Sequence, residues 1–185
     1  MKTNLFYLAA CFISLTFTSC ETDETMQQTN NSAASKVQIS DVTTIANMVP
    51  EYSTDLVIRN VYDAGDVNVY FDEQTAYFEY KMSDHWRARK VQLYVGDYEL
   101  VPTSTAGNAA PERFPIRSSY VDGTETVVYA VNRAALPDCF AVSARAEVYK
   151  TGLNLNVQNE TAWGYGDRFT SRDWSMYFNV CQPNN

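Results

Sequence analysis

Residues 140–149 read Phe140-Ala141-Val142-Ser143-Ala144-Arg145-Ala146-Glu147-Val148-Tyr149. Apolar and polar side chains alternate along most of this segment, and one face is entirely apolar: Phe140, Val142, Ala144, Ala146 and Val148. Successive side chains of a β-strand point to opposite faces, whereas a helix places its apolar residues three or four positions apart. The segment therefore predicts a β-strand with one buried face.

The same period of two recurs from about residue 52 to the C-terminus. The clearest further examples are residues 67–71, 75–82, 91–95, 124–131 and 174–180. The polar pair Glu73-Gln74 separates the first two and suits a tight hairpin turn. No window of a dozen residues has the apolar spacing of an amphipathic helix. We therefore predict an all-β fold, a single antiparallel β-sandwich domain formed by residues 51–185.

Composition and charge exclude several classes of function. The chain has 185 residues, with Lys+Arg 14 against Asp+Glu 22 and a formal net charge of -8. Such an acidic chain is poorly suited to phosphate backbones, so we expect no nucleic-acid partner. His85 is the only histidine, and the sequence has no Gly-x-Ser-x-Gly motif and no P-loop. We expect no enzyme activity, no cofactor and no metal site.

The N-terminus has the features of an export signal. Lys2 precedes an apolar run, Leu5 to Phe17, which at about thirteen residues is too short for a bilayer core that needs about 20. The residues before Cys20 resemble the lipobox of bacterial lipoproteins, in which the cysteine is acylated, although Phe17 departs from the usual leucine. We predict a signal peptide over residues 1–19 and lipidation of Cys20. The alternative is a secreted protein in which Cys20 is incidental.

Residues 20–50 form the predicted linker. Glu21, Asp23 and Glu24 follow the cysteine closely and resemble the acidic signal that directs Bacteroidota lipoproteins to the outer face of the outer membrane, although acidic residues are also common in ordinary linkers. The following Gln-, Asn- and Ser-rich residues cannot bury enough apolar surface to offset the entropy of ordering. We predict a disordered linker. Near the end of the linker, three apolar residues are spaced like one face of a helix, so a short helical turn stays an open alternative there: Ile39, Val42 and Ile45.

Two cysteines belong to the predicted domain, Cys139 and Cys181. Export places them in an oxidising compartment, where paired cysteines are usually bridged. A redox or metal pair would need a Cys-x-x-Cys spacing or further ligands, and the chain has neither. We therefore predict a structural disulfide between Cys139 and Cys181.

Five segments of the predicted domain form a recognisable set. They are Asp63-Ala64-Gly65-Asp66-Val67, Leu93-Tyr94-Val95-Gly96, residues 107–115, Trp174-Ser175-Met176-Tyr177-Phe178 and, most specifically, Glu160-Thr161-Ala162-Trp163-Gly164-Tyr165-Gly166-Asp167-Arg168-Phe169. Together they resemble an extracellular β domain of Bacteroidota outer-membrane or surface lipoproteins. The resemblance implies an extracellular β architecture and no particular activity. Relatives often carry histidine where this chain has Gln92 and Arg145, so no imidazole chemistry carries over to these positions.

Residues 160–169 allow two interpretations. One is a ligand pocket with Trp163 as its floor and Glu160 and Arg168 as polar contacts. The other is a rigid loop that closes one end of the fold, in which Glu160 and Arg168 pair and glycines permit unusual backbone angles. Separately, Asp63, Asp66 and Asn68 supply oxygen atoms for a calcium ion, but they lack the EF-hand spacing and also suit a polar turn.

The predicted membrane anchor and the lack of catalytic motifs together suggest that the protein binds a partner and does not catalyse a reaction. We expect a non-catalytic binding subunit of a cell-envelope complex, anchored in the bilayer through Cys20 and docked on an outer-membrane protein. The alternative is a glycan-binding module, suggested by Tyr 13, of which only Tyr7 lies in the signal peptide. Aromatic residues are also enriched at protein interfaces and do not separate the two hypotheses. An enzyme is the third and weakest hypothesis.

Overall fold

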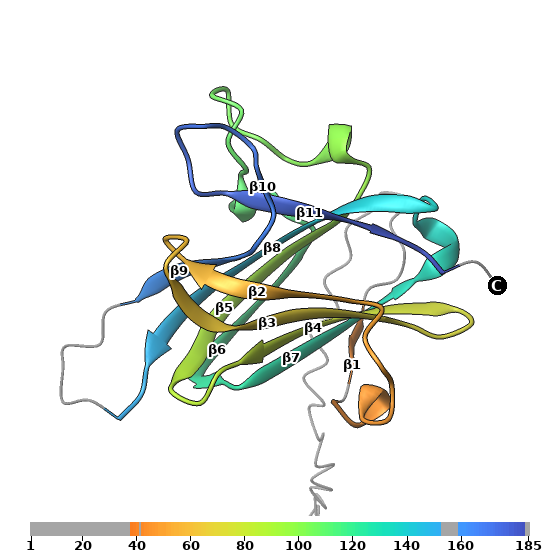
Figure 1. The fold of residues 1–185 in the computed structure, drawn as a ribbon, viewed down its shortest axis with the longest axis horizontal. Coiled ribbons are helices and arrows are strands. Elements are labelled where there is room, and N and C mark those ends of the chain that lie inside the picture. Colours follow the sequence, from red (N-terminus) through yellow and green to blue (C-terminus); the bar gives the residue numbers. More distant parts are fainter. Residues whose placement is uncertain (1–37, 41, 153–158, 184–185) are drawn as a thin grey trace, which may run out of the picture. The chain divides into compact units, whose positions relative to one another are not determined.

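A computed structural model describes residues 38–40, 42–152 and 159–183 (Figure 1). The signal peptide, Cys20 and most of the predicted linker lie outside the described residues. The strands are β1 Gln38–Ser40, β2 Tyr52–Ile58, β3 Tyr62–Phe71, β4 Thr75–Met82, β5 Trp86–Gly96, β6 Ile116–Thr124, β7 Thr126–Asn132, β8 Cys139–Lys150, β9 Glu160–Gly164, β10 Asp167–Arg168 and β11 Met176–Cys181. Helical structure in these ranges is limited to short 3₁₀ turns: η1 Val42–Ile45, η2 Tyr98–Leu100, η3 Pro111–Arg113 and η4 Arg133–Ala135.

The strands form one continuous antiparallel sheet. It runs β1-β7-β4-β3-β2-β9-β8, and β8 pairs on its other edge with β5, which pairs in turn with β6. The opposite edge of β8 pairs with two strands. β11 pairs with its first residues, 139–142, and β9 pairs with residues 145–148. The all-β, antiparallel prediction is therefore confirmed.

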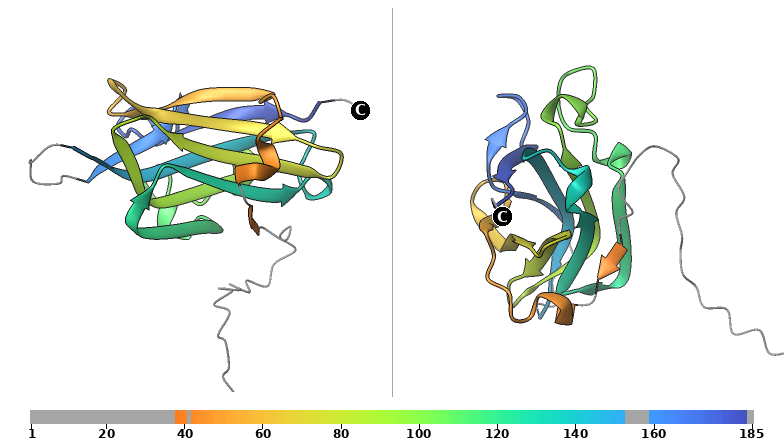
Figure 2. Two further views of the ribbon diagram at one scale, coloured as in Figure 1. Left: turned by 90° about the horizontal axis from the view of Figure 1, so that it is seen from below. Right: turned by 90° about the vertical axis from the view of Figure 1, so that its right-hand side faces the viewer.

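The sheet curls strongly, as the views in Figure 2 show. Phe78 of β4 and Phe140 of β8 are separated by β3, β2 and β9 in the pairing order, yet their ring centroids are only 6.2 Å apart. A single curled sheet thus supplies both sides of the core, and a sandwich of two separate sheets is not confirmed. The reason is β9, which pairs with both β2 and β8 and so joins the two halves.

The main core lies on the concave side of the sheet. All five apolar residues of the 140–149 pattern are buried in it, and so are Ala76, Phe78, Tyr80 and Met82 of β4. The predicted hairpin between β3 and β4 is also confirmed, with Phe71 opposite Ala76. Burial of one face of each strand removes this apolar surface from water and supplies most of the stabilising free energy.

The last strand begins later than the sequence predicts. Phe178 and Val180 point into the main core as expected, but β11 starts only at Met176, and Trp174 lies outside it with 45% of its surface exposed. Met176 is buried in a second cluster on the opposite side of the sheet. In the sequence, apolar and polar residues still alternate across residues 174–176. The backbone there instead bends toward residue 169, and Phe169 N donates to Ser175 O at 3.1 Å.

Residues before Tyr52 also join the domain. β1 pairs with β7, Ile39 lying opposite Tyr129. The 3₁₀ turn η1 follows, and Ile45 is buried against Tyr70, Tyr77 and Val128 on the outer face of the sheet. Within the expected linker, β1 and Ile45 are therefore packed on the sheet.

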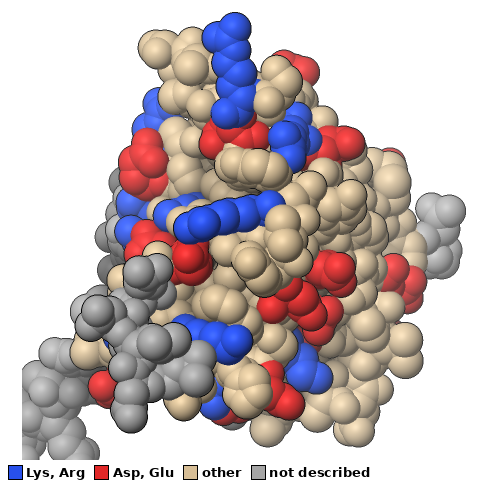
Figure 3. Space-filling model, turned by 60° about the vertical axis from the view of Figure 1, so that its left-hand side comes forward, with Lys and Arg blue, Asp and Glu red and all other residues tan. Residues whose placement is uncertain are grey.

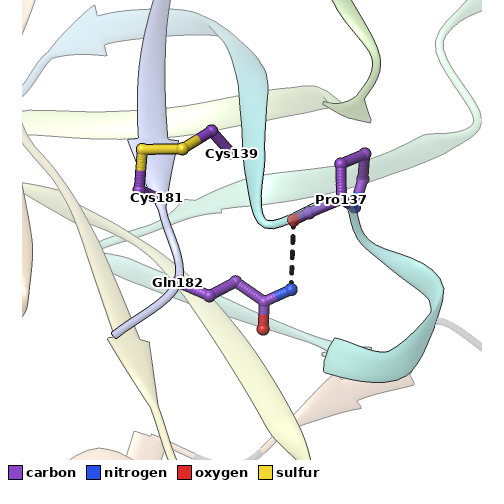
Figure 4. Close-up of a disulfide and its surroundings, with 4 residues drawn as sticks. All are labelled: Pro137, Cys139, Cys181 and Gln182. Atoms are coloured by element: carbon purple, nitrogen blue, oxygen red, sulfur yellow. Dashed lines mark hydrogen bonds between the residues drawn. A yellow bond between two sulfur atoms is a disulfide. The ribbon is translucent and has the colours of Figure 1, made fainter. Parts of the chain in front are cut away.

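The predicted disulfide is confirmed. Cys139 and Cys181 are direct cross-strand partners in β8 and β11, and their sulfur atoms are bonded (Figure 4). Next to the bridge, Gln182 Nε2 donates to Pro137 O at 3.1 Å, as Figure 4 shows. Gln182 Oε1 accepts from Arg133 Nε at 2.9 Å. The C-terminal residues are thus attached to the turn before β8 by covalent and hydrogen bonds.

Candidate functional site

A pocket of about 270 Å³ opens beside β9, on the side of the sheet opposite the main core. Its apolar wall consists of Val57 of β2, Trp163 of β9 and Met176 of β11. These three residues belong to a second apolar cluster, which the loop after β5 covers with Val101 and Phe114. Two of the three predicted site residues, Glu160 and Trp163, line this pocket.

The polar side of the pocket consists of Arg59, Asn159, Glu160 and Thr161. Arg59 Nη2 donates to both carboxylate oxygens of Glu160, at 3.2 Å to Oε1 and 3.1 Å to Oε2. The pair is half open to solvent, since the Arg59 side chain is 68% exposed and that of Glu160 25%. The rim therefore offers hydrogen-bond donors and acceptors side by side while its formal charges cancel.

Arg59 occupies an unusual backbone position. It and Asn60 form the turn between β2 and β3, with φ values of 52° and 61°, and Val61 N donates to Ile58 O at 3.0 Å. Positive φ at both central residues matches the twist of a hairpin, but only Gly, Asn and Asp adopt it readily. The turn places the Arg59 side chain beside β9. Arg59 is not among the site residues predicted from the sequence, although Asn60 between two strand patterns is a usable turn signal.

Arg168 is not part of the pocket wall, and the predicted pairing of Arg168 with Glu160 is wrong. Glu160 instead pairs with Arg59, because β9 runs antiparallel to β2 and brings its first residue next to the β2–β3 turn. The Arg168 guanidinium lies over the Trp174 ring, 4.0 Å from its centroid. Trp174 lines the pocket. Arg168 therefore acts on the site only through Trp174, which the sequence pattern assigned to a strand.

The turn after Trp163 is rigid for a different reason than expected. Neither Gly164 nor Gly166 has a φ in the left-handed region. Both are sites of close approach: a Cβ on Gly166 would lie 2.1 Å from Tyr177 O, and one on Gly164 would lie 2.9 Å from the Phe178 ring. Tyr165 N donates to Asp55 O at 2.8 Å, which fixes the turn to β2. The segment thus combines a structural turn at its end with pocket residues at its start.

A polar network on the same face extends from the pocket. Arg145 Nη2 donates to Thr161 Oγ1 at 3.2 Å, and Arg145 Nη1 donates to Glu147 Oε1 at 3.0 Å and also to Gln92 Oε1. Gln92 and Arg145 are direct cross-strand partners. These bonds fix Thr161, and with it the first half of β9, against β8.

A second exposed feature lies where two loops meet. Residues 97–115 and 165–175, here called the loop pair, lie side by side at the upper edge of Figure 1. Thr170 Oγ1 donates to Asn108 Oδ1 at 2.7 Å, and Ala109 N donates to Ser175 Oγ at 3.2 Å. Tyr98, Phe169 and Tyr177 pack together there, with ring centroids 4.6–6.0 Å apart. We call these three residues the aromatic cluster.

The described residues include no group of three or more His, Cys, Asp or Glu side chains arranged to hold a metal ion. In the candidate calcium turn, Asp63 Oδ1 accepts from Gly65 N at 2.7 Å. Asn68 points to other partners, donating to Glu79 Oε2 at 2.8 Å and accepting from Ser53 Oγ at 2.6 Å. This geometry favours the polar turn. His85 is exposed in the β4–β5 turn.

Comparisons with protein-family models, with curated proteins and with solved structures found no match. Kinship to Bacteroidota surface lipoproteins therefore stays a prediction. Within the described part of the chain, no helix is long and apolar enough to cross a bilayer. Cys20 lies outside the described residues, so its lipidation also stays a prediction.

Proposed function

We propose that this protein is a non-catalytic binding subunit of a cell-envelope complex, held at the outer membrane, facing outward, by lipid on Cys20. Its partner is an outer-membrane protein that contacts the loop pair. The aromatic cluster is the observation that carries this proposal. A lipid anchor fixes the domain near the membrane, where a neighbouring protein is within reach: the part of the predicted linker before β1, residues 20–37, has an expected r.m.s. length of about 23 Å.

The loop pair presents apolar surface on a firm support. Tyr98 is 42% exposed and Leu100, two residues on, is 68% exposed. Tyr98 and Phe169 stack at an interplanar angle of 13°, and the Tyr98 ring also packs against Tyr177, so both neighbours restrain the partly exposed ring of Tyr98. Aromatic residues held rigidly at low entropic cost are typical anchors of protein interfaces.

On the face shown in Figure 3, surface charge gives no competing explanation for binding. On the side shown in Figure 3, basic and acidic side chains are interspersed. An interface without a strong field of one sign depends on shape and apolar contact more than on steering. We therefore expect partner binding to be only weakly dependent on salt.

The test compares the full-length protein with two variants in its own membrane. Tyr98→Ala/Leu100→Ala removes the exposed apolar side chains of η2. Val121→Ala removes a side chain that is 92% exposed on β6, away from the loop pair, and is the matched control. After cross-linking and solubilisation, we expect one stoichiometric partner with the wild type and the control and its loss with the double variant. Equal recovery from all three proteins, or no partner at all, would contradict the proposal.

A glycan-binding module is the second candidate function. One observation favours it: the half-exposed Trp174 lines a pocket whose other wall carries Arg59 and Glu160. An aromatic ring beside paired donors and acceptors suits a sugar, which has both apolar and hydroxyl surface. Retention of the full-length protein on polysaccharide gels, and its release by Trp174→Ala, would support this function. Passage through every gel without retention would exclude it.

A further inference from the structure

We propose that the pocket beside β9 binds one neutral pyranose ring, stacked on Trp174 and hydrogen-bonded through its hydroxyl groups to Arg59 and Glu160. This inference rests on the second candidate function, glycan binding, and is independent of the aromatic cluster. Four features of the pocket support it: its size, the state of Trp174, the charge balance of the rim and the backbone of Arg59.

The size fits a small ligand. At about 270 Å³ the cavity lies just below the range of about 300–1,000 Å³ that is typical of pockets for drug-sized molecules. It is lined on one side by Val57, Trp163 and Met176 and on the other by polar side chains. A pyranose has the same division, with axial C–H groups on its faces and hydroxyl groups around its edge.

The contacts of Trp174 suit stacking with a sugar ring. Arg168 covers one face of the indole at 4.0 Å and is not itself a lining residue. Arg168 thus leaves the other face of the indole uncovered, and the proposal places the sugar ring on that face. Asp173 fixes the backbone and its neighbour, since its carboxylate accepts from Trp174 N at 2.8 Å and from Ser175 Oγ at 2.6 Å. An indole held in place loses little entropy when a C–H face of a sugar packs on its electron-rich surface.

The rim selects for neutral ligands with adjacent hydroxyl groups. The charges of Arg59 and Glu160 cancel. The carboxylate of an acidic sugar would therefore be attracted by Arg59 but repelled by the neighbouring Glu160 carboxylate. The net charge of -8 adds a general repulsion of anions. Two neighbouring hydroxyl groups, by contrast, can donate to Glu160 and accept from Arg59 without loss of the ion pair.

The backbone of Arg59 is consistent with a positioned contact residue. A non-glycine residue with φ near 52° costs roughly 1–2 kcal/mol relative to the right-handed conformation. Such an outlier motivates a hypothesis of function because surrounding structure must compensate for it. Here the turn directs the guanidinium to the pocket rim, where it lies beside Glu160.

The experiment is a titration of the full-length protein in detergent. Methyl β-D-glucopyranoside, β-D-galactopyranoside and α-D-mannopyranoside are the neutral probes, and methyl β-D-glucuronide is the acidic one, followed by tryptophan fluorescence and calorimetry. For about a dozen non-hydrogen atoms at about 0.3 kcal/mol each, we expect a Kd on the order of 1 mM for at least one neutral probe. The glucuronide should bind roughly tenfold more weakly than the matched glucoside, corresponding to about 1.4 kcal/mol.

Two pairs of variants locate the site. Trp174→Ala should weaken binding roughly tenfold or more, whereas Trp86→Phe, outside the pocket, should leave it unchanged. Glu160→Gln should also weaken binding roughly tenfold, because the hydrogen bond to a charged acceptor is lost. Glu125→Gln is its matched control, since Glu125 also pairs with an arginine, Arg87, but on another part of the surface. Glu160→Gln keeps the test decisive if Trp174→Ala fails to fold.

Three results would overturn the inference: no binding of any neutral probe up to about ten times the expected Kd, equal or tighter binding of the glucuronide, or full binding by folded Trp174→Ala or Glu160→Gln. None of these results affects recovery of a protein partner, which depends on Tyr98 and Leu100. Conversely, loss of that partner with unchanged sugar binding would leave the pocket assignment intact.

Discussion

Arg59 and Glu160, 101 positions apart in the sequence, form an ion pair in which one guanidinium nitrogen contacts both carboxylate oxygens. Because Arg59 is largely exposed, solvent screens the attraction, and such pairs contribute about 0–1 kcal/mol. We expect Glu160→Gln to lower the free energy of unfolding by less than about 1 kcal/mol in urea titrations. Trp163→Ala, at a site only 7% exposed, should cost about 3–5 kcal/mol. Similar losses for the two variants would show that the ion pair is structural.

The disulfide should contribute strongly to stability. It joins residues 42 positions apart, and the loop-entropy relation gives about 4 kcal/mol for a loop of that length. We expect Cys139→Ser/Cys181→Ser to lower the free energy of unfolding by about that amount. Addition of a reductant should then destabilise the wild type and leave the double variant unchanged. A wild type insensitive to full reduction would contradict this prediction.

Gly166 is required for space rather than for backbone freedom. An added Cβ would lie 2.1 Å from Tyr177 O, so β10 or β11 would have to move. We expect Gly166→Ala to cost about 3 kcal/mol, as overpacked sites do. Gly152→Ala is the control: its φ is +83° but nothing lies within 4 Å of the new Cβ, and we expect a loss of about 1 kcal/mol. Equal losses from thermal or urea unfolding would mean that close approach is not the constraint.

Stability at alkaline pH should depend on Tyr94. Burial, with a smaller contribution from Asp97, raises the pKa of Tyr94 to about 12, while an unfolded tyrosine titrates near a pKa of about 10. Between these values the unfolded chain loses the phenolic proton and the folded protein keeps it, so the free energy of unfolding falls as pH rises. The contribution is complete below about pH 10 and disappears as pH passes through about 12.

Tyr94→Phe measures this contribution. At pH 7 the variant should be less stable by about 1 kcal/mol, because the hydrogen bond from Tyr94 Oη to Asp97 O, 2.7 Å long in the wild type, is lost. From about pH 10 upward the difference between the two proteins should shrink and then reverse. Urea midpoints measured at several pH values check this. A difference that stays constant up to pH 11.5 or so would contradict the assigned direction.

Lipidation of Cys20 predicts that a substitution at this residue changes both the cell fraction that contains the protein and the mass of its N-terminal peptide. Cys20→Ser should release the protein from the membrane, and the N-terminal peptide should lose the mass of its acyl chains, since stable anchoring needs more than one chain. Cys11→Ser, within the predicted signal peptide, is the matched control and should remain membrane-bound. An unacylated wild-type chain in the soluble fraction would remove the basis for the proposed envelope function.

Strand positions were predictable from the sequence because the direction of a side chain in a strand alternates locally. The 140–149 pattern and the β3–β4 hairpin needed only this rule, and both appear in the structure. The rule does not tell where a strand begins. At residues 174–176 the alternation continued through a bend, and Trp174 was therefore placed in a strand rather than at a pocket.

The amino-acid sequence thus determined the β class, the buried face of β8 and the two cysteines that bond, because these depend on local alternation and on the residues available. Tertiary structure alone decided that one sheet curls around the core, that Glu160 pairs with Arg59 and not Arg168, and that Trp174 joins them at a pocket. These contacts link the β2–β3 turn, β9 and the segment before β11. They depend on which strands become neighbours, and no local pattern encodes that order.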